Sequence, residues 1–194
     1  MYKTIVIDPA WKLCSGGSKS LAVHTHYQVQ TTAEIIQTVK SWIEEYPISE
    51  EAHLYLWTIN PYSSGYTNGI RDGIKVCEAI GFKPISNLIW CKPQNNPTPY
   101  GLRSTEICIF ATRHRKGYHK RIMYGGSNDQ YSVAKNGLKK SRDWFVADRR
   151  EHSRKPDEFY KLVTQRSNGP YLEMYSRTER KGWTTLGNER GKFQ

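Results

Sequence analysis

The sequence predicts an α/β fold with a mostly parallel sheet and helices on both faces, and two observations support this prediction. Short apolar runs rich in β-branched residues alternate with longer segments whose apolar residues recur at helical spacing, an alternation typical of parallel sheets. Polar residues follow directly after several of the apolar runs, and ligands bind at the carboxyl ends of the strands in such sheets. The length of 194 residues indicates one domain spanning residues 1–194, with room for a substantial core.

Six apolar runs predict the strands. They are rich in Val, Ile, Leu, Trp and Tyr, and most of them stop at a turn-forming or charged residue. In chain order they cover residues 4–7, 53–59, 87–91, 106–111, 144–147 and 171–175.

Two helices are expected in the first half of the chain. The first starts at Thr31 or Thr32, either of which can cap it, and carries apolar residues at helical spacing as far as Ile43. The second covers residues 68–80 and ends at Gly81, because glycine adopts the C-cap conformation without strain.

A third helix and three loops complete the predicted elements. Pro156 suits the first turn of a helix, and the two acidic residues after it favour the helix dipole, so a helix is expected as far as Arg166. Residues 12–30 are rich in Gly, Ser and His, and residues 93–101 contain three prolines and two asparagines, so both are predicted as loops. The tail, residues 182–194, is predicted as a loop with one apolar turn.

Basic residues are concentrated in the second half of the chain. The net charge is +11, yet residues 1–111 carry nine basic and nine acidic residues, whereas residues 112–194 carry twenty and nine. A one-sided basic excess suits a surface that binds a polyanion, although a solvated surface without a partner has the same composition. Residues 112–143 lack apolar periodicity and are predicted as a basic, loop-rich insertion.

Other features of the composition favour a cytoplasmic protein without a membrane or metal partner. No apolar run approaches the ~20 residues that span a bilayer, and the N-terminus has no signal-peptide pattern. The four cysteines are scattered without a CxxC pair, so free thiols are expected. His24 and His26 lack a third ligand nearby, so no metal site is predicted.

The segment Asp8-Pro9-Ala10-Trp11 follows the first predicted strand and suits chemistry at an exocyclic amine. Such an amine is a poor nucleophile because its lone pair is delocalised into the ring. A carboxylate and a backbone carbonyl can each accept one of its N–H bonds and orient the lone pair toward an electrophile. Trp11 offers a flat face on which a base can stack, a contact worth roughly 1–3 kcal/mol. A base inside a duplex must first be flipped out of the helix to reach such a site. The alternative is that Asp8 starts a turn and Trp11 fills the core.

Motifs along nearly the whole chain carry a resemblance to a known family. They are His26-Tyr27, LWTIN at 56–60, LIWCKP at 88–93, TEICIFATR at 105–113, HSRKPDEFY at 152–160, YLEMYSR at 171–177 and GWTTLGNE at 182–189. In this order they resemble the adenine-N6 methyltransferase family founded by the catalytic subunit of the eukaryotic mRNA m6A writer. HSxKPDEFY and GWxxxGNE are the most specific, and the short length is similar to phage and bacterial members.

The resemblance implies a Rossmann-like class I methyltransferase domain with permuted motif order, in which the catalytic strand precedes the cofactor-binding strand. It implies S-adenosylmethionine as the cofactor, and Asp8, Pro9 and Trp11 as the catalytic residues that hold the target adenine. The implied substrate-binding residues are Tyr27, Lys92 and Glu106. The implied cofactor-binding residues are Asp8, Ser153, Lys155, Arg177, Asn188 and Glu189, with Lys155 on the cofactor carboxylate and the last three on the ribose hydroxyls.

Several residues keep an alternative interpretation. Tyr27 is either a residue over the site or a packed loop aromatic, and Glu106 either lies near the target base or serves a structural salt bridge. Trp57 and Trp90 match family tryptophans, but their strand positions favour the core. Ala10 replaces the second proline of the family pattern, which leaves the loop less constrained; retained but slower catalysis is expected.

The substrate is expected to be nucleic acid, with DNA favoured by the similarity to short phage and bacterial members and RNA left open. Basic segments at 113–121 and 135–142 suit phosphate contacts, which give affinity rather than sequence choice. Family members pair, so a homo- or hetero-dimer is an open expectation. The rival functions are a non-catalytic nucleic-acid-binding subunit of a methyltransferase complex and methylation of another amine, such as cytosine N4.

Overall fold

The computed structural model describes residues 1–12, 29–59, 69–98, 101–114, 143–151, 154–188 and 191. It confirms the predicted α/β class, with a seven-stranded sheet in the order β5-β3-β4-β2-β1-β6-β7. The strands are β1 (Tyr2–Ile7), β2 (Ile48–Thr58), β3 (Lys83–Thr98), β4 (Gly101–Arg113), β5 (Trp144–Val146), β6 (Tyr171–Met174) and β7 (Trp183–Leu186).

The directions of the strands bring most of their carboxyl ends to one edge of the sheet. β1 lies between β2 and β6 and is parallel to both, β7 is parallel to β6, and β5 is parallel to β3. Among the described strands only β4 runs the other way, antiparallel to β2 and β3. The carboxyl ends of the other six strands therefore lie at the edge where β4 starts, called the carboxyl edge below.

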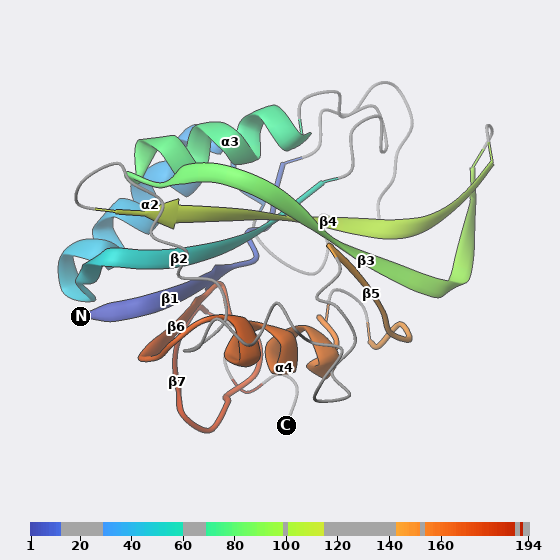
Figure 1. Cartoon of the computed structure of the whole chain (residues 1–194). Coiled ribbons are helices and arrows are strands. Elements are labelled where there is room, and N and C mark those ends of the chain that lie inside the picture. The colour runs from blue at the N-terminus through green and yellow to red at the C-terminus, as the bar shows by residue number, and fades with distance from the viewer. Residues whose placement is uncertain are drawn as a thin grey trace.

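Helices cover both faces of the sheet, as Figure 1 shows. α2 (Thr32–Glu45) and α3 (Gly69–Ala79) lie on one face, and α4 (Asp157–Arg166) lies on the other. Side chains along β1 alternate between these faces: Ile5 and Ile7 pack in the cluster with α2 and α3, while Val6 packs in the cluster with α4. The two faces therefore hold two separate apolar cores, called the α2/α3 core and the α4 core.

Local signals in the sequence account for the ends of the helices. The hydroxyl of Thr31 accepts from the backbone N–H of Glu34 while the Glu34 carboxylate accepts from that of Thr31, a capping box that starts α2. The prediction that Thr31 or Thr32 caps this helix is confirmed for Thr31. Gly81 has φ of 79° just after α3, which confirms the predicted glycine stop.

The prediction of a loop over residues 93–101 is wrong for the part that the structure describes, residues 93–98 and 101. β3 continues to Thr98 and pairs with β4 in a long hairpin, with Pro97 opposite Leu102 and an irregular register between Cys91 and Asn96. Among the described residues, β5 pairs with β3 over residues 89–91, and no described strand pairs with the same side of β3 beyond this point. A proline tolerates an edge because its missing N–H can face away from the ladder.

The predicted loop in the tail, residues 182–194, also needs correction. Residues 183–186 form β7, which pairs in register with β6 from Trp183 opposite Tyr171 to Leu186 opposite Met174. Four residues are too few for a periodicity to be visible in the sequence, and tertiary pairing decides the conformation.

Two further expectations concern the insertion and the membrane. Most of the predicted basic insertion at 112–143, namely residues 115–142, lies outside the described residues. Within the described ranges, no helix has both the length and the apolar character that crossing a bilayer requires.

Gly69 is expected to be essential for packing α3 against the end of β2. A Cβ at this position would lie 2.0 Å from the carbonyl oxygen of Ile59, and a backbone atom cannot move aside easily. Gly69→Ala should therefore lower the free energy of unfolding by about 1–3 kcal/mol, as overpacking does. Urea unfolding measures this change. Ser41→Ala at an exposed position of α2 is the control, and equal stabilities of the two variants would contradict the close approach.

Candidate active site

Asp8 lies at the carboxyl edge, directly after β1. Its backbone N–H donates to the carbonyl oxygen of Met174 at 3.4 Å, which continues the ladder between β1 and β6. Because side chains alternate along a strand, Asp8 follows Val6 on the α4 face of the sheet. Its carboxylate is therefore directed toward the residues that precede α4.

An alternating chain of charges surrounds Asp8. Lys155, just before α4, places its Nζ 2.9 Å from Oδ1 of Asp8 and 3.4 Å from Oε2 of Glu106. Lys92 of β3 donates to the other oxygen of Glu106 at 2.5 Å. The structure thus brings together four of the residues predicted for the site: Lys92, Glu106, Lys155 and Asp8, called the ion-pair chain below.

Charged neighbours in the ion-pair chain favour the ionised forms of Glu106 and Lys155 although both are largely buried. Burial would raise the pKa of Glu106, but Lys155 and Lys92 outweigh burial and hold that pKa below its usual value. Burial would likewise lower the pKa of Lys155, but Asp8 and Glu106 hold it above its usual value. The ion-pair chain contains two lysines and two acidic residues, so opposite charges are present in equal number.

Two tryptophans form an aromatic wall beside the ion-pair chain. The ammonium of Lys155 lies 4.9 Å from the centre of the Trp57 ring, and that of Lys92 lies 4.7 Å from the centre of the Trp90 ring, within cation–π range. Both tryptophans are buried in the α4 core, as their strand positions predict. The indole N–H of Trp90 donates to the carbonyl of Ala147, whereas that of Trp57 has no partner among the described residues.

The rest of the segment after Asp8 is held by hydrogen bonds. The backbone N–H of Trp11 donates to the carbonyl of Pro9, and Gln30 donates to the carbonyl of Ala10. Trp11 turns to the opposite face, where it is 7% exposed in the α2/α3 core and its indole N–H donates to the carbonyl of Trp57. The burial of Trp11 fits the alternative of a core residue better than an open stacking face.

The predicted cofactor residues after β6 and β7 lie farther along the same edge. Arg177 is half-buried three residues beyond β6, and Asn188 is exposed two residues beyond β7. Tyr27, Ser153 and Glu189, which the sequence also predicts for the site, lie outside the described residues.

Three residues beside Asp8 are not among those predicted from the sequence. Glu173 of β6 is 4% exposed and accepts from the Tyr160 hydroxyl, and Arg180 lies over the Tyr160 ring. One signal could have found them, because Glu173 is an isolated carboxylate between Leu172 and Met174 in an apolar strand. Lone buried carboxylates are rare and need partners.

The arrangement suits recognition of a polar, partly anionic ligand and of an amine. Lysine Nζ has three N–H donors, and Lys155 uses two of them on Asp8 and Glu106. Asp8 offers carboxylate oxygens for donors such as an amine, and the Pro9 carbonyl keeps a second lone pair. The residues therefore provide one cation for a carboxylate and two acceptors for an amine at the same edge.

Comparison with known proteins identifies the family. The model of the MT-A70 family matches residues 2–189, and a search of curated proteins finds no match. MT-A70 is the family of N6-adenine methyltransferases that includes the m6A writer subunit, and its fold is a methyltransferase fold. The mostly parallel seven-stranded sheet agrees with that fold, and the resemblance seen in the sequence motifs is confirmed. The chain therefore belongs to the MT-A70 family.

Proposed function

We propose that this protein transfers a methyl group from S-adenosylmethionine to the exocyclic N6 amine of adenine in DNA. The observation that carries the proposal is the ion pair between Asp8 and Lys155 at 2.9 Å. It joins the carboxylate of the amine-binding motif to the lysine of the cofactor motif in a member of the MT-A70 family. The two halves of a two-ligand site thus meet at one point.

The residues around Lys155 fit the cofactor. The third N–H of Lys155 is available for the cofactor carboxylate, a charge-assisted hydrogen bond. Arg177, Asn188 and Glu189 are proposed to hold the ribose, and Ser153 to support the same region. When bound, the cofactor supplies a methyl group attached to a positively charged sulfur, which is the electrophile of the reaction.

Asp8 and Pro9 are proposed to orient the amine. The Asp8 carboxylate accepts one N–H bond of the adenine amine and the Pro9 carbonyl accepts the other, so the nitrogen lone pair faces the methyl group. The nitrogen must release a proton after the transfer, and the Asp8 carboxylate is the stronger base of these two acceptors. Lys92, Glu106 and Tyr27 are proposed to contact the base or the nucleic-acid backbone.

Hydrogen bonds compensate for the alanine in the catalytic motif. A proline at position 10 would constrain φ, whereas here the turn around Ala10 is closed by the Trp11 N–H on the Pro9 carbonyl and by Gln30 on the Ala10 carbonyl. Trp11 anchors the same turn through its indole N–H on the Trp57 carbonyl. We therefore propose that Trp11 assists adenine binding by fixing this turn, and that catalysis is retained.

Product analysis tests the reaction and the substrate together. The protein is incubated with S-adenosylmethionine and either plasmid DNA or RNA. The nucleic acid is then digested to nucleosides, which are separated and identified by mass spectrometry. N6-methyladenine in the DNA is the expected product. Methylation confined to RNA would replace DNA as the substrate, methylcytosine would overturn adenine as the target, and absence of cofactor heat in calorimetry would favour a non-catalytic subunit.

Removing the Asp8 carboxylate should stop methyl transfer without unfolding the protein. Asp8→Ala and Asp8→Asn are expected to lower kcat by at least about 100-fold, as loss of a positioned hydrogen-bonding group does at other active sites. Lys155 keeps Glu106 as a partner, so urea unfolding should change little. Full activity in Asp8→Ala would remove Asp8 from the mechanism.

Lys155 should be required for cofactor binding. Lys155→Met removes the only ammonium shared by Asp8 and Glu106 among the described residues. The dissociation constant for S-adenosylmethionine should rise about tenfold or more, and a tenfold rise corresponds to about 1.4 kcal/mol of binding free energy. Lys155→Arg keeps the charge and should bind better than Lys155→Met. Calorimetry measures both, with Lys161→Met on the exposed side of α4 as the matched control. Equal affinities of Lys155→Met and Lys161→Met would contradict the assignment.

A further inference from the structure

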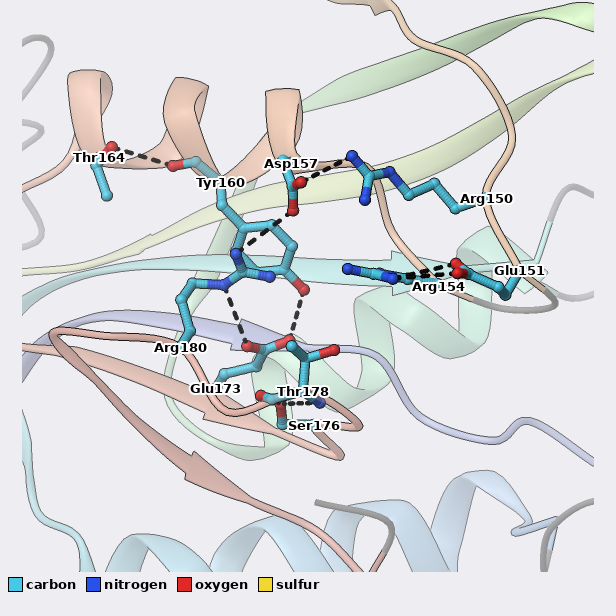
Figure 2. Close-up of polar contacts among 10 residues, drawn as sticks. All are labelled: Arg150, Glu151, Arg154, Asp157, Tyr160, Thr164, Glu173, Ser176, Thr178 and Arg180. Carbon is cyan, nitrogen blue, oxygen red and sulfur yellow. Dashed lines mark hydrogen bonds and ion pairs between the residues drawn. The ribbon is translucent and has the colours of Figure 1, made fainter. Parts of the chain in front are cut away.

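A partly buried cluster near the ion-pair chain joins α4 to the connection between β6 and β7. It consists of Asp157, Tyr160, Glu173 and Arg180 and is called the arginine clamp below (Figure 2). Tyr160 donates to Oε1 of Glu173 at 2.5 Å, and the guanidinium carbon of Arg180 lies 3.4 Å from the centre of the Tyr160 ring. Arg180 also approaches Oδ1 of Asp157 at 3.6 Å and Oε2 of Glu173 at 4.0 Å.

The arginine clamp connects three segments of the carboxyl edge. One carboxylate oxygen of Asp157 pairs with Arg180. The other lies 2.8 Å from the guanidinium of Arg150, which follows β5. The carbonyl of Arg180 accepts from the backbone N–H of Trp183, and the Trp183 ring packs edge-on against Tyr160. The position of the β6–β7 connection relative to α4 is thus determined by side chains of the clamp.

Stability alone does not explain the arginine clamp. Burial raises the pKa of Glu173 to about 6, because Tyr160 and Arg180 offset burial only in part and Asp8 raises the pKa further. At neutral pH the folded state therefore carries an ionised carboxylate at a net cost. Oε2 of Glu173 and Nε of Arg180 are buried without a hydrogen-bond partner among the described residues. Groups kept at such a cost are typical of functional regions.

The two segments that the arginine clamp joins carry the two halves of the proposed cofactor site. Lys155, proposed for the cofactor carboxylate, is two residues before Asp157 at the start of α4. Arg177, proposed for the ribose, is three residues before Arg180 in the β6–β7 connection. A cofactor that contacts both must span a distance that the clamp fixes.

We propose that Arg180, with Glu173 and Tyr160, is a positioning residue that holds the two halves of the cofactor site at the spacing required by S-adenosylmethionine. The inference rests on the proposed function. Arg180 acts through the backbone that carries Arg177 and through α4, and it does not touch the transferred methyl group. The clamp therefore contributes to cofactor affinity and leaves the chemical step to Asp8.

Substitution of Arg180 should weaken cofactor binding more than it slows the reaction. Arg180→Met should raise the dissociation constant and KM for S-adenosylmethionine about tenfold through loss of preorganisation, while kcat at saturating cofactor stays within about threefold. Arg180→Lys should restore little, because an ammonium cannot reproduce the planar stacking of a guanidinium on Tyr160. Lys161→Met is again the control. An unchanged KM in Arg180→Met would overturn the proposal, and so would full rescue by lysine.

The variant Glu173→Gln separates an effect on cofactor positioning from an effect on stability. It is expected to lower the cofactor affinity while it raises the free energy of unfolding. In the wild type, the folded state takes up a proton as the pH falls from about 6 to 4.5, so stability rises over that interval. Glu173→Gln should therefore unfold at higher urea than wild type at pH 8, with the difference shrinking below pH 6. Its cofactor affinity at pH 8 should nevertheless be lower, because Arg180 loses one of its two carboxylate partners and keeps only Asp157 among the described residues. Higher stability with unchanged affinity would contradict the clamp.

Calorimetry distinguishes failure of the proposed function from failure of the arginine clamp alone. If the wild type gives no heat with S-adenosylmethionine, the proposed function and the clamp both fail. If the wild type binds and Arg180→Met and Glu173→Gln bind equally well, the clamp alone fails. Wild-type binding with weakened binding in both variants supports the proposal, and urea unfolding shows that each variant is folded.

Discussion

The ammonium group of Lys155 holds together a site whose two carboxylates would otherwise repel each other. Asp8 directly follows β1, Glu106 lies in the middle of β4 and Lys155 comes from the segment before α4, so one cation joins three separate parts of the chain. Lys92 completes the charge balance. Buried charges are tolerated only when they are paired, and the geometry of this edge therefore depends most on Lys155, which pairs with both carboxylates.

The two faces of the sheet differ in composition: one carries the charged residues of the candidate site, and the other is an apolar core. The α4 face carries the charged groups and the aromatic wall, whereas the α2/α3 face is an apolar core that contains Trp11. The segment from Asp8 to Trp11 crosses from one face to the other. Its first residue therefore points into the candidate active site while its last residue is fixed in the core, and rigidity of the core is transmitted to the position of the carboxylate.

Much of the fold and part of the site could be predicted from the sequence, and the remainder depends on contacts between distant residues. Strong local signals, such as the capping box at Thr31 and the glycine after α3, predict elements correctly. The hairpin through Pro97 and the short β7 were missed because strand pairing overrides weak local preference. Motif resemblance predicted Asp8 and Lys155, but no local pattern says that Lys155 bonds Asp8 directly, or that Glu173 meets Arg180.

The interior position of β1 determines when the sheet can be completed during synthesis. β1 pairs with β2 on one side and with β6 on the other, and Thr4 bonds to Asn168, 164 residues later. At typical translation rates of roughly 5–20 residues per second, β1 waits on the order of ten seconds for its second neighbour. Contacts this distant in sequence also slow folding. The nascent chain thus exposes an unpaired apolar strand edge for that interval, and such an edge can pair with other chains before synthesis is complete.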